Sequence, residues 1–148
     1  MARVRRRSVQ QAVQMKGTSS AQFTGRIVKR GTAEGIALVS PQPIGFLGGV
    51  DPETGLVIEK GHPLAGQCVT DRVLIFPSGK GSTVGSYTLY RMARAGTAPA
   101  AIINVASEAI VAVGAIISDI PMVDQIDIAK FRTGDRVRVA GSRVTVLR

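Results

Sequence analysis

The hydrophobic pattern in the middle of the chain predicts strands that alternate with helices. Apolar runs of strand length occupy residues 69–76, 100–105 and 121–123. Between them, residues 82–95 and 107–117 carry apolar side chains at helical spacing. Strands joined through helices pair in parallel, because the helix carries the chain back to the same end of the sheet. We therefore expect a parallel central layer.

The two ends of the chain alternate polar and apolar residues, which predicts antiparallel strands. Apolar side chains would face the core and arginines would face solvent. The pattern as a whole predicts an α/β domain with a mixed sheet or barrel-like β core and packed helices. The predicted strands cover 23–29, 36–40, 136–139 and 143–147, with a turn at 31–35. The residues of the last two strands that are expected to face the core are Val137, Val139, Val144 and Val146.

Three further stretches complete the predicted elements. Residues 41–55 are rich in glycine and proline, which favours turns, and a short strand is expected at 56–59. The longest apolar run, 109–117, is far shorter than the roughly 20 residues of a membrane helix and is predicted to be a buried core segment. Ser107 is expected to cap its helix, with Glu108 in the first turn. The apolar residues of the glycine-rich stretch, expected to pack against this chain or a partner, are Ile44, Phe46, Leu47 and Val50.

The stretch at 74–90, LIFPSGKGSTVGSYTLY, joins the end of a buried strand to a glycine-rich loop and the start of a helix. Gly79 and Gly81 permit positive φ and close backbone approach. Ser82 and Thr83 are suited to cap the helix. A loop that enters a helix in this way directs unpaired N–H groups and the positive end of the helix dipole at whatever lies in front of it.

This loop differs from the phosphate-binding P-loop in two positions. A P-loop has glycine six residues before its lysine, where this chain has Leu74, and Ser or Thr directly after it, where this chain has Gly81. The simplest interpretation is therefore a tight turn in which Ser82 only caps the helix. The functional interpretation places its hydroxyl in the field of the N–H groups and of the positive charge of Lys80.

The net charge of +9 is concentrated near the N-terminus. Eight basic residues and no acidic residue precede Glu34, whereas eleven basic and ten acidic residues lie from Glu34 onward. A nucleic-acid-binding domain would spread basic residues over its folded surface, among aromatic residues that stack on bases. Because the chain from Glu34 onward has nearly balanced charge, a nucleic-acid-binding function is disfavoured. We expect residues 1–20 to form a flexible or partner-docked basic arm, and residues 21–148 to form one folded domain.

The inventory of reactive residues is small. The single cysteine, Cys68, excludes an internal disulfide and favours a reducing compartment, the cytoplasm. Together with the single histidine, His62, it cannot fill a zinc or iron-sulfur site, so no metal ligand is predicted. A hydrolase built from Ser82, His62 and Asp51 or Asp71 would lack the G-x-S-x-G elbow. No combination of these residues forms a complete active site, which indicates a subunit whose active site is completed by a partner.

Several blocks of the sequence, in order, resemble one known family. The resemblance extends from about Gly25 to Leu147 and begins with GRIVKRGTAEGIALVS at 25–40. Taken together, the blocks resemble the small subunit of the aconitase X family. The other blocks are GFLGGVDPETG at 45–55, HPLAG at 62–66, FPSGKGSTVGSYTLY at 76–90, GTAPAAIIN at 96–104 and IVAVGAIISDIP at 110–121.

The resemblance implies a fold, a partner and a reaction. The fold would be a swivelling β/β/α domain, docked on a large subunit that holds an iron-sulfur cluster of the 4Fe-4S type. The implied activity is that of a hydro-lyase in the archaeal mevalonate pathway of isoprenoid biosynthesis, converting (R)-5-phosphomevalonate to trans-anhydromevalonate 5-phosphate. The GKGSTVGSY form of the loop favours this substrate. Dehydration of cis-3-hydroxy-L-proline and a non-catalytic, regulatory role remain alternatives.

The resemblance also implies a catalytic residue. In the family, the serine directly after Gly-Lys-Gly accepts the proton, and here that serine is Ser82. A serine hydroxyl is a poor base unless its alkoxide is stabilised, which backbone N–H groups, the helix dipole and Lys80 would do. The iron of the partner would polarise the departing hydroxyl. A second hypothesis is that Lys80 and the N–H groups of Gly81 and Thr83 bind an anionic part of the substrate.

Overall fold

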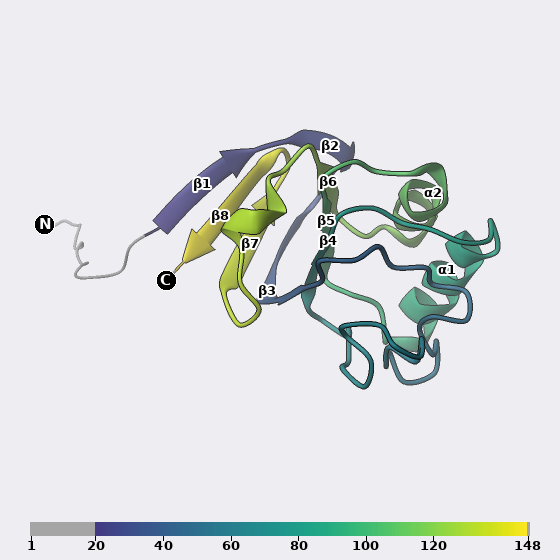
Figure 1. Cartoon of the computed structure of the whole chain (residues 1–148). Helices are drawn as coiled ribbons and strands as arrows, with labels where there is room; N and C mark the ends of the chain where they lie inside the picture. Colours follow the sequence, from purple (N-terminus) through teal and green to yellow (C-terminus); the bar gives the residue numbers. More distant parts are fainter. Residues whose placement is uncertain (1–19, 148) are drawn as a thin grey trace, which may run out of the picture.

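A computed structural model describes residues 20–147 of the chain, which fold into an eight-stranded sheet with two helices (Figure 1). The expected arm lies outside these residues except for Ser20, which opens the first strand. The helices are α1 (Gly85–Ala95) and α2 (Ala109–Ser118), with a short 3₁₀ turn at Ile128–Lys130. The strands are β1 (Ser20–Thr24), β2 (Arg26–Lys29), β3 (Thr32–Val39), β4 (Val73–Phe76), β5 (Ala101–Asn104), β6 (Met122–Asp124), β7 (Arg136–Ala140) and β8 (Arg143–Leu147).

The strand order β1-β8-β7-β3-β4-β5-β6-β2 confirms the expected mixed sheet. Strands β3, β4, β5 and β6 pair in parallel. Helix α1 joins β4 to β5 and helix α2 joins β5 to β6, as expected for parallel neighbours, whereas an irregular segment joins β3 to β4. Strands β1, β8, β7 and β3 pair antiparallel at one end, and β2 pairs antiparallel with β6 at the other. Both helices lie beside the parallel part of the sheet (Figure 1). The loops at the carboxyl ends of β4 and β5 therefore enter these helices.

The single strand predicted at 23–29 is two strands in the structure. Gly25 separates β1 from β2, which pair at opposite ends of the strand order and so give the sheet its barrel-like closure. A Cβ at Gly25 would collide with the backbone oxygen of Asp124 and lie 2.9 Å from Ile126 Cδ1. The turn predicted at 31–35 is also wrong, since residues 32–35 pair with β7 as the first half of β3.

Two groups of buried side chains form the core. One fills the space between the sheet and the helices, and the other lies within the curve of the antiparallel strands. The four valines of β7 and β8 that were expected to face inward are at most 1% exposed, which confirms the register. Ile44, Phe46 and Val50 also belong to the core, whereas Leu47 is half exposed. Those three side chains therefore pack against this chain and are not available to a partner.

Two predicted strands, at 56–59 and at 69–76, are shorter in the structure. The strand at 56–59 is reduced to isolated bridges, between Val50 and Val57 and between Leu56 and Cys68. Residues 69–72 lie outside β4, which begins at Val73. Asp71 has a positive φ of 59°, a conformation that interrupts extended backbone.

Helix α2 differs most from its prediction as a buried segment. Val111, Gly114 and Ala115 are buried, but Val113, Ile116 and Ile117 are exposed. Gly114 brings the helix close to α1, because a Cβ there would lie 2.6 Å from Leu89 Cδ1 and 3.3 Å from Ser86 Cα. The two helices thus pack tightly along one line, and the opposite apolar side of α2 remains uncovered in this chain.

Replacement of Gly114 by alanine is expected to lower the free energy of unfolding by about 1–2 kcal/mol. The clash with Leu89 Cδ1 outweighs the gain in helix propensity, which is about 1 kcal/mol. Urea denaturation of Gly114→Ala, of Leu89→Ala and of the double variant measures the coupling. The double variant should lose less stability than the sum of the single losses, since it lacks the clashing atom. Strictly additive losses would contradict the assigned contact.

Candidate functional site

The loop from Pro77 to Val84 joins the carboxyl end of β4 to α1 and is held on two sides. The N–H of Ile44 donates to the carbonyl of Ser78 (3.2 Å), and the N–H of Lys80 donates to the carbonyl of Ile44 (3.2 Å). On the other side, the N–H of Val105 donates to the carbonyl of Pro77 (3.0 Å). These bonds fix the first half of the loop before it reaches Ser82.

Asn104, at the carboxyl end of β5, adds a side-chain bond to this support. Its fully buried amide donates to the carbonyl of Phe76 (2.9 Å) and to the carbonyl of Ile103 (3.1 Å). Phe76 is the last residue before the loop, so Asn104 holds the point at which the loop leaves the sheet. Sequence reasoning missed this residue, although a polar side chain at the end of an apolar strand is a usable signal. Its Oδ1 accepts no hydrogen bond within residues 20–147.

The two glycines of the loop serve the two purposes that were expected of them. Gly81 has a positive φ of 96°, which favours glycine strongly over other residues. Gly79 permits a close approach, because a Cβ there would collide with Glu108 Oε1 and with Val111 Cγ2 at the start of α2. The loop therefore reaches Ser82 across the N-terminus of α2.

Helix α1 begins later than predicted. Its N-cap is Val84, which makes no side-chain cap bond, so the expected caps Ser82 and Thr83 are wrong. Instead, the carbonyl of Ser82 accepts from the N–H of Gly85 (2.9 Å), and the carbonyl of Thr83 accepts from the N–H of Ser86 (3.2 Å). These tight turns lead into the helix. They use the donors that a helix N-terminus would otherwise direct at a ligand.

Ser82 is exposed at the end of this loop. Its Oγ accepts one hydrogen bond, from the N–H of Val84 (3.2 Å). The N–H groups of Gly81, Ser82 and Thr83 donate to no atom of residues 20–147. Three consecutive unpaired donors in an exposed loop provide a place for negative charge. The unpaired donors of this region therefore belong to the loop and not to the first turn of α1.

Lys80 is paired with an acidic residue that sequence reasoning left out. Its Nζ lies 2.8 Å from Glu59 Oε2, with the two side chains 46% and 32% exposed. Gly45 provides space for the stem of Lys80, since a Cβ there would lie 3.3 Å from Lys80 Cγ. Part of the lysine charge is thus already balanced in this chain. No sequence signal links Glu59 to Lys80, because they are twenty-one residues apart.

The N-terminus of α2 is capped by Glu108 and not by Ser107. Glu108 Oε2 accepts from the N–H of Ile110 (2.8 Å), and Oε1 accepts from the N–H of Val111 (2.7 Å). The N–H of Ser107 instead donates to Asp124 Oδ2 (3.0 Å). The longer glutamate side chain can reach the N–H groups of the second and third helical residues and lie against Gly79 at the same time.

Asp124 is a buried carboxylate that connects β6 to β2 and to the start of α2. Arg26 donates to it twice, from Nε to Oδ1 (3.0 Å) and from Nη2 to Oδ2 (2.7 Å). Burial by itself raises the pKa of Asp124, but the hydrogen bonds from Arg26 and Ser107 outweigh burial and hold the pKa below its ordinary value. The carboxylate therefore stays ionised and keeps these elements together.

His62 is not a partner of Ser82. Its Nδ1 accepts from the N–H of Leu64 (3.0 Å), so Nε2 carries the proton that it donates to the carbonyl of Pro43 (3.0 Å). Both ring nitrogens are occupied, which removes the Ser–His–Asp alternative. Cys68 is partly buried, with its thiol 3.2 Å from the hydroxyl of Thr70. Within residues 20–147, no three His, Cys, Asp or Glu side chains converge where they could hold a metal ion.

Comparisons with known proteins identify the family of this chain. The sequence model of the aconitase X swivel domain family matches residues 22–147 of this chain. The phosphomevalonate dehydratase small subunit of Methanococcoides burtonii is 54% identical over 77% of this chain and 85% of its own length. The protein of the same name from Pyrococcus furiosus is 53% identical over 80% of this chain and 89% of its own length.

A solved structure agrees as well. The crystal structure of Thermococcus kodakaraensis aconitase X in its holo-form matches with a TM-score of 0.85 and 49% sequence identity. The match covers 86% of this chain and 99% of that chain. Sequence and fold lead to the same conclusion, which is that this chain belongs to the aconitase X swivel domain family.

Proposed function

We propose that this chain is the small subunit of a hydro-lyase that converts (R)-5-phosphomevalonate to trans-anhydromevalonate 5-phosphate. The observation that carries the proposal is the exposed Ser82 hydroxyl, next to three unpaired backbone N–H groups on a loop held by β5 and α2. The relatives that share about 54% of their residues with this chain are named phosphomevalonate dehydratase small subunit. That name supports both the substrate and the existence of a larger partner.

In the proposed reaction, Ser82 is the general base. Its ionised Oγ removes the proton from C2 of the substrate, and the electron pair of that C–H bond forms the C2–C3 double bond. The hydroxyl leaves C3 as hydroxide, takes up a proton from solvent and departs as water. Ser82 then returns one proton to solvent, so that atoms and charge balance over the cycle. The N–H of Val84, which donates to Oγ, stabilises the ionised serine, since donors to the charged form lower the pKa of a hydroxyl. The exposure of Ser82 leaves it open to a substrate held by a second chain.

The iron-sulfur cluster implied by the family does not fit this chain. Cluster ligation requires several thiolates, whereas the full sequence has one cysteine and one histidine. The thiol of Cys68 is also engaged by Thr70. We therefore assign the cluster to the larger subunit, and the active site would be shared between the two chains. Within residues 20–147, no helix has the length and apolar character needed to cross a bilayer.

Reconstitution tests this proposal. The chain is mixed anaerobically with the large subunit of the same organism, whose cluster has been rebuilt, and loss of water from phosphomevalonate is followed by NMR. We expect turnover with both chains present and none with either chain alone. Water loss from cis-3-hydroxy-L-proline alone would reassign the substrate. Full turnover by the large subunit alone would make this chain a regulatory partner and would refute the proposal.

Lys80 is expected to contribute to substrate binding in this complex. A Lys80→Met variant should raise the Michaelis constant about tenfold or more, because a charge-assisted hydrogen bond to the phosphate or carboxylate is lost. The turnover number should change far less. Lys60→Met is the matched control, since Lys60 is exposed and adjoins Glu59 without pairing with it. An unchanged Michaelis constant for Lys80→Met would remove Lys80 from the site.

A further inference from the structure

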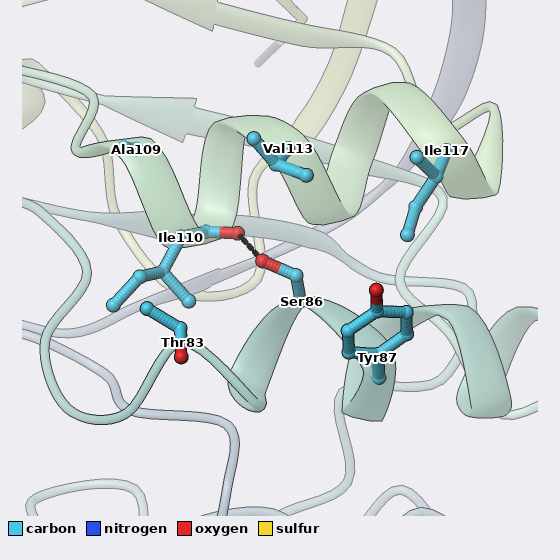
Figure 2. Close-up of a pocket in the computed structure, with 7 residues that line it drawn as sticks. All are labelled: Thr83, Ser86, Tyr87, Ala109, Ile110, Val113 and Ile117. Carbon is cyan, nitrogen blue, oxygen red and sulfur yellow. Dashed lines mark hydrogen bonds between the residues drawn. The ribbon is translucent and has the colours of Figure 1, made fainter.

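An apolar groove runs between α1 and α2, directly beside the Ser82 loop (Figure 2). Its volume is about 330 Å³. Figure 2 shows Thr83, Ser86 and Tyr87 on one side and Ile110, Val113 and Ile117 on the other. We call this feature the α1–α2 groove.

The groove has a fixed floor. The hydroxyl of Ser86 donates to the carbonyl of Ile110 (2.6 Å), which joins the two helices across the groove (Figure 2). Gly114 and Gly85 allow the helices to approach closely, because a Cβ at Gly85 would lie 3.2 Å from Ile110 Cγ2. The groove is therefore preformed, and its rims cannot close on each other without breaking this packing.

Exposed large apolar side chains gather on the two helices that form the groove. Tyr87 is 68% exposed, Val113 47% and Ile117 44%. Six of the ten large apolar side chains exposed within residues 20–147 lie on α1, on α2 or at Val84 just before α1. Helix α2 contains no charged residue from Ala109 to Ser118. Apolar surface gathered in this way marks a protein interface.

The position of the groove identifies its occupant. Thr83 lines the groove and directly follows Ser82, so the two features form one continuous surface. A partner that brings its substrate to Ser82 would therefore lie next to the groove. Because α2 carries no charge, the matching surface must be apolar, since an unpaired charge buried against it would be costly.

We propose that the α1–α2 groove is the docking site for an apolar, uncharged surface of the larger subunit, which inserts at least one aliphatic or aromatic side chain between the helices. This inference rests on the proposed function, because it names the partner that completes the Ser82 site. The groove also replaces Ile44, Phe46 and Val50 as a candidate partner surface, since those side chains are buried in this chain.

Affinity measurements on matched variants test the groove. Val113→Glu places a charge on the rim, Val113→Ile keeps the rim apolar, and Leu56→Glu places the same charge on an exposed apolar residue outside α1 and α2. Each full-length variant is titrated with the purified large subunit by calorimetry, after circular dichroism has shown parental melting. We expect Val113→Glu to weaken binding at least about thirtyfold, and Val113→Ile and Leu56→Glu to bind within about threefold of the parent.

Turnover separates this inference from the proposed function. At saturating Val113→Glu, the turnover number should return to the parental value, because Ser82 is untouched. Equal affinity of Val113→Glu and the parent for the large subunit would overturn the docking role of the groove and leave the proposed function in place. A parent pair that binds but does not dehydrate phosphomevalonate would overturn the proposed function alone. The free chain could instead form dimers that Val113→Glu dissociates without weakening binding to the large subunit. That result would show that the groove joins two copies of this chain, and it would also overturn the inference.

Discussion

Replacement of Ser82 by alanine is expected to lower the turnover number of the assembled dehydratase about a thousandfold or more. The variant loses the atom that accepts the proton, and a positioned general base contributes roughly 10²–10⁴ in rate. The Michaelis constant should change little, because the backbone N–H groups of the loop remain. Turnover is measured with phosphomevalonate and a saturating concentration of each small-subunit variant.

The structure provides a control for this prediction. Ser78 lies in the same loop, and only its backbone carbonyl takes part in the bonds described above. Ser78→Ala should therefore keep nearly parental turnover. Ser82→Ala should also keep parental melting and parental affinity for the large subunit, since its side chain makes one exposed hydrogen bond. Turnover of Ser82→Ala within tenfold of the parent would assign the proton transfer to another group.

Replacement of Asp124 by asparagine is expected to lower the free energy of unfolding by about 2–3 kcal/mol at pH 7. The change keeps the shape of the side chain but weakens two bonds from Arg26 and one from Ser107. Urea denaturation at a series of pH values measures the loss. Glu34→Gln is the control, because its ion pair with Arg136 is exposed and should contribute little.

The difference in the free energy of unfolding between the parent and Asp124→Asn should decrease as the pH falls. The folded-state pKa of Asp124 lies below its ordinary value of 3.8, so the ionised carboxylate stabilises the folded chain above that value. The stabilisation is lost as the pH falls through the lowered pKa, where the parent also becomes neutral. The two stability curves should therefore converge below about pH 4. A difference that stays constant to pH 2 would mean that the charge of Asp124 contributes nothing.

These two residues show what a local sequence pattern can indicate and what it cannot. The loop that carries Ser82 is a local pattern, because a strand, two glycines, a lysine and a helix lie within one short stretch, whereas the catalytic role of Ser82 comes from the family resemblance and stays a prediction. Asp124 gave no signal, since its partner Arg26 is 98 residues away and pairs with it only after β2 has joined β6. The same limit explains why Asn104 and Glu59 were missed.

The sequence by itself determined the parallel centre, the antiparallel ends, the inward valines of β7 and β8, and the glycine loop that carries Ser82. These features depend on the periodicity of side chains and on backbone freedom, which are local properties. Only the tertiary structure decided that 23–29 is split at Gly25, that Glu108 caps α2, and that Lys80 pairs with Glu59. It also decided that the apolar run of α2 is half uncovered. The sequence shows that an apolar side chain favours burial, but it does not show whether this chain or a second chain covers that side chain.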